Sequence, residues 1–118
     1  MKRRTQSFAH ECVKYAVTFP DNDLGRHVRQ QLTRSATSVA ANYRAACIAQ
    51  TVPTTVAKMR IVFEEADESQ FRIEFMEEEA ETDRVKAQYL CGESHEITSI
   101  LLKAVMTLSN SSGAKFKQ

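Results

Sequence analysis

Glycine and proline are scarce in this sequence. Its 118 residues include only three glycines and two prolines. An all-β chain with many tight turns needs more of both, so their scarcity argues against that class. Alanine, glutamate, arginine and glutamine are plentiful, which is typical of helices. The sequence therefore predicts one all-α domain spanning 1–118.

Long apolar runs are also missing. No stretch approaches the ~20 apolar residues of a membrane span, and the basic start Met1–Arg4 leads into polar residues rather than the apolar segment of a signal peptide. The three cysteines, Cys12, Cys47 and Cys91, are odd in number and widely spaced. Buried free thiols are expected, rather than disulfides. We therefore expect a cytoplasmic protein without membrane contact.

Motifs that carry chemistry are absent from the sequence. No Cys-x-x-Cys, His-Glu-x-x-His, phosphate-binding loop or Gly-x-Ser-x-Gly occurs. None of the three histidines completes the Glu-x-x-His pair of a di-iron bundle. His95 lies between Glu93 and Glu96, where proton transfer and a surface hydrogen bond both remain open. We expect no enzyme, no cofactor and no bound metal.

Apolar spacing predicts four helices, at about 5–18, 23–48, 52–79 and 84–109, followed by a loose tail over 110–118. Joined by short turns, four helices predict an antiparallel up-down-up-down bundle. The expected buried stripe of the first helix is Phe8, Cys12, Tyr15 and Phe19. The expected stripe of the fourth is Val85, Tyr89, Ile97, Ile100, Leu101, Ala104 and Leu108.

The turns carry recognisable signals. Pro20 ends the first helix, because the residue before a proline avoids the helical region. Asp21 or Asp23 is expected to cap the second helix. Thr51 is the expected cap of the third, with Pro53 in its first turn, where the missing N–H costs little.

Charge is divided between the two halves of the chain. Residues 1–60 hold ten Lys/Arg against three Asp/Glu, a formal charge of +7, and residues 61–118 hold six against twelve, or −6. The halves either attract each other or solvate outer helix faces. Because neighbouring helices run antiparallel, Arg34 and Arg44 are predicted to pair with Glu65 and Glu68 on the third helix.

Three helices have more small or apolar residues than one buried stripe requires. A monomeric bundle would leave the surplus in exposed patches, so we predict a homo-oligomer. The predicted interface residues are Thr37, Ala40, Ala41, Phe71, Phe75, Leu102, Val105 and Met106.

Several of these stretches resemble one protein family. They are Phe19-Pro20, Gln31-Leu32, the run Arg34-Ser-Ala-Thr-Ser-Val-Ala-Ala-Asn-Tyr-Arg-Ala-Ala-Cys47, Glu64-Glu-Ala-Asp-Glu-Ser69, and Glu93-Ser-His-Glu-Ile-Thr98 before Ile100-Leu101. Together they resemble the bacterial four helix bundle protein family, which is related to proteins encoded in intervening sequences of large-subunit ribosomal RNA genes. The resemblance spans about Phe8 to Leu108.

The resemblance implies an antiparallel four-helix bundle that assembles into a homopentameric ring. A distant relative is the accessory protein of diversity-generating retroelements, a pentamer that binds a reverse transcriptase and nucleic acid. Most members of the family have no assigned activity.

Two functions are therefore expected. The first is a non-enzymatic oligomeric adaptor that binds RNA, single-stranded nucleic acid or a nucleoprotein such as a reverse transcriptase, by neutralising phosphates. The cations assigned to that contact are Arg3, Arg4, Lys14, Arg26 and Arg29. The alternative is a structural or protein-interaction module with no nucleic-acid role.

Overall fold

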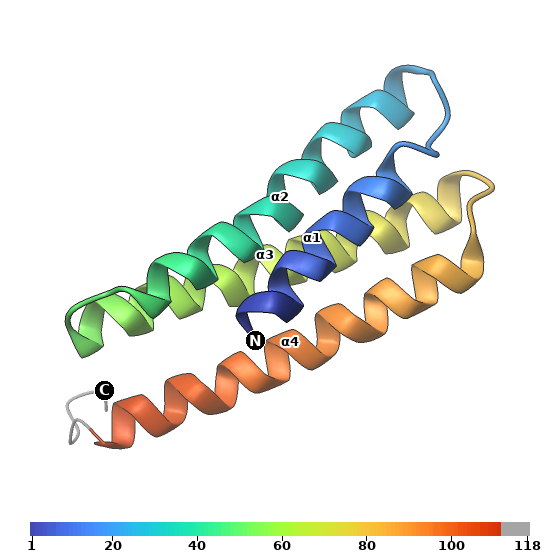
Figure 1. The fold of residues 1–118 in the computed structure, drawn as a ribbon. Helices are drawn as coiled ribbons and strands as arrows, with labels where there is room; N and C mark the ends of the chain where they lie inside the picture. Colours follow the sequence, from blue (N-terminus) through green and yellow to red (C-terminus); the bar gives the residue numbers. More distant parts are fainter. Residues whose placement is uncertain (112–118) are drawn as a thin grey trace.

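The protein is an antiparallel bundle of four helices (Figure 1). The computed structural model describes residues 1–111 and places α1 at Lys2–Ala16, α2 at Asp23–Cys47, α3 at Val52–Glu79 and α4 at Arg84–Ser111. Each helix packs against the next along the chain, and α1 also contacts α4. No strand occurs in this range. The predicted all-α four-helix fold is thus confirmed.

The helices differ greatly in length. α1 has 15 residues, whereas α3 and α4 have 28 each. At ~1.5 Å per residue, α1 is only about half as long as either of them. Figure 1 shows α1 beside the part of the bundle near the α1–α2 turn, while the other end is formed by α2, α3 and α4 alone.

The first helix begins and ends earlier than the predicted 5–18. Its first turn forms at once, with the Thr5 amide donating to the Met1 carbonyl at 2.9 Å. The buried Thr5 hydroxyl also bonds to the Lys2 carbonyl, at 3.0 Å. At the other end, the amides of Thr18 and Phe19 bond three residues back, to Tyr15 and Ala16. The chain therefore tightens into a turn before it reaches Pro20.

The caps of the remaining helices are polar side chains. Asn22, rather than the predicted Asp21 or Asp23, caps α2 by accepting from the Gly25 amide at 2.8 Å. Thr51 caps α3 by accepting from the Thr54 amide at 3.2 Å, as its sequence predicts.

The last helix also begins with a cap. Asp83 accepts from the Lys86 amide at 3.0 Å, one turn into α4. α4 then runs to Ser111, two residues beyond the predicted end. Asn110 and Ser111 therefore belong to the helix rather than to the predicted loose tail. The rest of that tail lies outside the described residues.

A layer of small side chains lies at the middle of the bundle. The hydroxyls of Ser35 and Ser69 are fully buried and 2.8 Å apart, which links α2 to α3. The buried Ser94 hydroxyl donates to the Ala66 carbonyl at 2.7 Å, which links α4 to α3. Small residues let the helices approach closely, and each of these three serine hydroxyls has a hydrogen-bond partner.

The core uses a different row of α4 from the predicted one. The predicted stripe is buried at Ile97 and Leu101, but Val85 is 78% exposed and Tyr89 56% exposed. The buried row instead reads Ala87, Leu90, Ser94, Ile97, Leu101 and Val105. Apolar residues cover a wide arc of α4, and its buried row includes the small residues Ala87 and Ser94. Apolar spacing alone therefore assigned the larger, exposed side chains of Val85 and Tyr89 to the core. All four residues predicted for the first helix are buried, although Phe19 lies in the turn after α1.

Candidate interaction surfaces

Two of the cations predicted to bind nucleic acid, Arg4 and Lys14, form ion pairs from α1. Arg4 donates to both oxygens of Glu93, at 2.5 and 3.0 Å. This pair joins α1 to α4 and raises the pKa of the guanidinium. Lys14 lies 3.4 Å from Glu11, one turn away on the same helix. Arg4 is therefore held firmly within the bundle, whereas the Lys14 pair is exposed and weak.

Arg26 and Arg29 are also engaged, at the α1–α2 turn. Arg26 lies 2.8 Å from both Asp21 and Asp23. Arg29 donates to the carbonyls of Ala16 and Phe19, at 3.2 and 3.0 Å, so it caps the end of α1. Because these contacts hold the Arg29 guanidinium against the end of α1, it is poorly placed to bind a phosphate group.

Arg3 differs from the other four predicted cations. It is exposed and forms no hydrogen bond or ion pair within the described range. The predicted nucleic-acid surface is thus not a continuous patch of free charge. The Arg26–Asp23 pair could have been found from its i,i+3 spacing, whereas the Arg4–Glu93 pair depends on how α1 sits on α4.

The predicted ion pairs form at Arg34 but not at Arg44. Arg34 donates to Glu65 at 3.1 and 3.2 Å and to Glu68 at 2.6 Å, contacts that raise its pKa. Arg44 is exposed and makes no such contact within residues 1–111. Its prediction was wrong because it lies further along α2, opposite the part of α3 that precedes the first carboxylate, Glu64.

An exposed aromatic pair marks the outer side of α3. Phe71 is 54% exposed and Phe75 is half-buried, with their ring centroids 6.0 Å apart. The Arg72 guanidinium lies 5.5 Å from the centre of the Phe71 ring, within cation–π range. Both predicted interface phenylalanines therefore have surface available to a partner.

The predicted small-residue face is on α2. Thr37 and Ala41 are exposed and Ala40 is half-buried. The Thr37 hydroxyl bonds back to the Thr33 carbonyl at 2.7 Å, so it is already satisfied within α2. A shallow hollow between α1 and α2 is lined by Gln6, Ala9, His10, Val13, Thr37 and Ala40.

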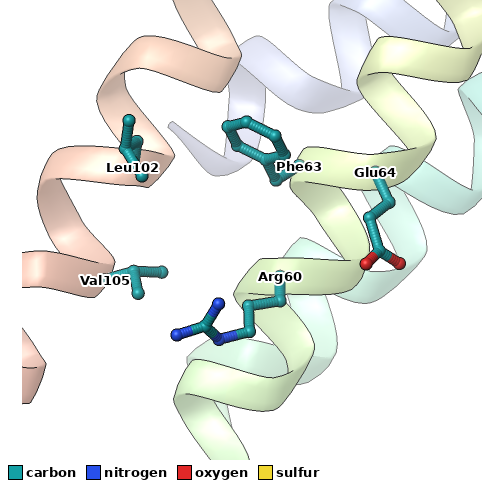
Figure 2. Close-up of a pocket in the computed structure, with 5 residues that line it drawn as sticks. All are labelled: Arg60, Phe63, Glu64, Leu102 and Val105. Atoms are coloured by element: carbon teal, nitrogen blue, oxygen red, sulfur yellow. The ribbon is translucent and has the colours of Figure 1, made fainter. Parts of the chain in front are cut away.

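A second hollow lies between α3 and α4 (Figure 2). Its volume is about 230 Å³, and its lining residues are Arg60, Phe63, Glu64, Leu102 and Val105. Leu102 and Met106 are exposed, at 48% and 57%. Val105 is only 7% exposed, so it belongs to the monomer's own packing and not, as predicted, to surplus surface.

The structure gathers the carboxylates away from one end of the bundle. No Asp or Glu occurs between Asp23 and Glu64, or after Glu96. Residues 35–63 and 97–111 are here named the carboxylate-free end. They include the α2–α3 turn and the second half of α4, which lie at the same end of the bundle (Figure 1). Its four cations are Arg44, Lys58, Arg60 and Lys103. None of them forms an ion pair within the described residues.

The thiols and histidines form no reactive pair. Cys12 is buried, which raises its pKa, whereas His10 is exposed. Burial also raises the pKa of Cys91, to about 11. Within 1–111, no three His, Cys, Asp or Glu side chains are grouped to hold a metal ion. No helix in the same range is long and apolar enough to cross a bilayer.

One solved structure places this fold among known proteins. No protein-family model matches the sequence, and no curated protein matches it. The structure is similar to the crystal structure of a protein of unknown function from the S23 ribosomal protein family of Bacteroides thetaiotaomicron. The TM-score is 0.78, at 25% identity over 88% of this chain and 96% of that chain. The two proteins share the same four-helix fold.

Proposed function

We propose that the protein is a non-enzymatic, homo-oligomeric adaptor related to the bacterial four helix bundle proteins. The observation that carries this proposal is the exposed Phe71 ring on α3, which lies beside the half-buried Phe75. Aromatic side chains on an outer helix face are typical of contact surfaces. The pentameric number rests on the family resemblance.

The second copy of the chain is the best occupant of this aromatic surface. α2 carries a small-residue face at Thr37 and Ala41, against which large rings can lie flat. Contact between two unlike surfaces is heterologous and closes into a ring when the rotation between copies allows it. The contact would therefore join α3 of one copy to α2 of the next.

Charge supports the same pairing. Asp67 and Glu74 are exposed on α3 near Phe71, and neither is held by an ion pair within the described residues. Arg44 is exposed three residues after Ala41 on α2 and is equally free. A copy-to-copy contact would bring these opposite charges together, which accounts for an arginine that lacks a partner within its own bundle.

The test is a mass measurement by light scattering and native mass spectrometry. The wild type is expected to form a homo-oligomer, and Ala41→Arg is expected to dissociate it, because a long cation would enter the close contact. Ala41 is exposed, so the variant subunit should still fold. Gln88→Arg, at an exposed position on α4, is the matched control. A monodisperse 13.4 kDa wild type at micromolar concentration would overturn the proposal.

Nucleic-acid binding is a second candidate function, supported by the free cations Arg3 and Arg44. Four of the five cations first assigned to it are engaged within the bundle, so a protein partner is the better-supported version of the adaptor. Anisotropy of a labelled single-stranded RNA at low and moderate salt tests the candidate, since phosphate neutralisation weakens steeply with salt. Unchanged anisotropy at tens of micromolar protein in low salt would remove it.

A further inference from the structure

The seam between α3 and α4 at the carboxylate-free end combines an apolar hollow with an unpaired cation. Figure 2 shows the Phe63 ring pointing towards α4, while Leu102 and Val105 approach from the other side. The Arg60 side chain extends across the seam towards Val105. Its guanidinium has no hydrogen-bond or ion-pair partner among the described residues. A cation beside apolar surface is thus left without its counter-charge.

The apolar surface extends beyond the hollow. Met106 lies one turn after Leu102 on α4 and is 57% exposed. Phe63, Leu102 and Met106 together form a strip, here named the seam strip. Lys103 is exposed next to Leu102 and has no partner in the described part of the chain. The strip is therefore flanked by a cation on each helix.

The hollow is suited to a side chain rather than to a cofactor. Its volume of about 230 Å³ is below the ~300–1,000 Å³ of typical small-molecule sites. One large apolar side chain would fill it. Glu64 also lines the hollow, at the edge of the carboxylate-free end. Because like charges repel, Glu64 would direct an incoming acidic group away from itself and towards Arg60 and Lys103.

We propose that the seam strip binds an acidic amphipathic helix of a partner protein. One large apolar side chain of that helix would enter the hollow, and carboxylates beside it would pair with Arg60 and Lys103. An apolar groove between two helices recognises such a ligand through residues spaced three or four apart. This inference rests on the proposed adaptor function and names the chemistry of its partner.

Other occupants fit the seam less well. RNA would use the two cations but not the aliphatic side chains of Leu102 and Met106, and Phe63 alone offers an exposed ring for stacking there. In the proposed oligomer a second copy makes its contact between Phe71 on α3 and Ala41 on α2, and that contact does not pair Arg60 or Lys103. An acidic helix uses both the apolar strip and the cations.

The experiment uses fluorescein-labelled peptides of about 18 residues, long enough for helix formation. One peptide carries leucines on one face and glutamates on the other. A matched peptide carries lysines in place of the glutamates, and a U-rich RNA oligonucleotide is the third probe. The acidic peptide should bind the full-length wild-type protein, and Arg60→Gln with Lys103→Gln should weaken that binding at least ~10-fold. Leu102→Ser should weaken it similarly.

Control variants are placed at the other end of the bundle. Lys14→Gln removes a cation, and Val17→Ser removes an exposed apolar side chain at the end of α1. Both should leave peptide affinity unchanged. Equal binding of the lysine peptide, or no effect of the seam variants, would overturn the proposal. RNA that displaces the acidic peptide and depends on Arg60 and Lys103 would replace it with nucleic-acid binding.

Light scattering on the same variants separates this inference from self-association. Seam variants that lose the peptide but keep the wild-type mass support it. Variants that split the oligomer would assign the seam strip to the contact between copies and overturn it. If the wild type binds the peptide as a monomer, the proposal for the seam strip stands and the proposed homo-oligomer is overturned.

Discussion

The hydroxyl oxygens of Ser35 and Ser69 lie 2.8 Å apart at the centre of the bundle, with both side chains fully buried. Each hydroxyl also lies within hydrogen-bond distance of a carbonyl on its own helix, Leu32 for Ser35 and Glu65 for Ser69, so one hydroxyl donates to the other and the second donates to its carbonyl. Two small side chains at this crossing therefore let α2 and α3 approach closely without leaving a polar atom unpaired.

Enlarging this contact should destabilise the protein. Ser69→Leu would put three carbons in place of one hydroxyl oxygen in a closely packed layer, with an expected loss of ~1–3 kcal/mol of unfolding free energy. Ser69→Ala should cost less, about 0.5–1 kcal/mol, because Ser35 keeps its bond to Leu32. Urea unfolding followed by circular dichroism at one protein concentration measures both. Ser99→Leu, at an exposed position on α4, is the control, and equal losses at both sites would contradict the packing argument.

The two helical glycines should respond oppositely to alanine. A Cβ at Gly25 would lie 1.8 Å from the Pro20 carbonyl oxygen, so Gly25→Ala must displace the α1–α2 turn. We expect a loss of ~1–3 kcal/mol. A Cβ at Gly92 would meet no atom within 4 Å, and Gly92→Ala should stabilise α4 by up to ~1 kcal/mol. Thermal unfolding tests both, and a stabilising Gly25→Ala would refute the close approach.

Local signals predicted much of the fold. Thr51 and Pro53 located the start of α3, because a cap and a first-turn proline act within a few residues. The antiparallel packing of neighbouring helices was enough to predict the ion pairs of Arg34 with Glu65 and Glu68. By contrast, the contact at Gly25 and the Arg4–Glu93 pair arise from tertiary placement, which apolar spacing does not encode.

The division of charge between the halves of the chain leads to ion pairs between them, such as Arg34–Glu65 and Arg4–Glu93. Counting the chain by halves separates α1 and α2 from α3 and α4. The structure shows a second division, along the bundle axis, because residues 35–63 and 97–111, which contain no Asp or Glu, lie together at the end of the bundle that holds the α2–α3 turn. Only the antiparallel fold brings these two runs together, so Arg60 and Lys103 were not recognised as candidates.

The seam between α1 and α4 should weaken in acid. Lys86 donates to Glu11 across this seam, and this bond, with a smaller contribution from Lys14, lowers the pKa of the carboxyl. Since the folded pKa lies below the ordinary 4.5, the stabilisation is complete above 4.5 and is lost as the pH falls through the folded value. Glu11→Gln should therefore flatten the loss of stability below about pH 4.5.

Urea midpoints at neutral pH and at several acidic values measure this effect. Glu78→Gln is the matched control, because Glu78 is exposed and forms no ion pair within the described residues. It should retain the wild-type acid dependence. If both variants flatten the curve equally, general charge repulsion rather than the Lys86–Glu11 contact governs acid unfolding.

The three thiols should react in the order of their exposure. Cys47 is exposed and should react first with a disulfide reagent at pH 8, so Cys47→Ser should remove the fast phase. Cys91 is half-buried with its pKa raised to about 11, so its rate should be low and rise steadily towards that pH as the thiolate forms. Cys12 is fully buried on α1 and should react only as the protein unfolds. Modification of Cys12 as fast as Cys47 under native conditions would instead show that α1 detaches from the bundle by local unfolding.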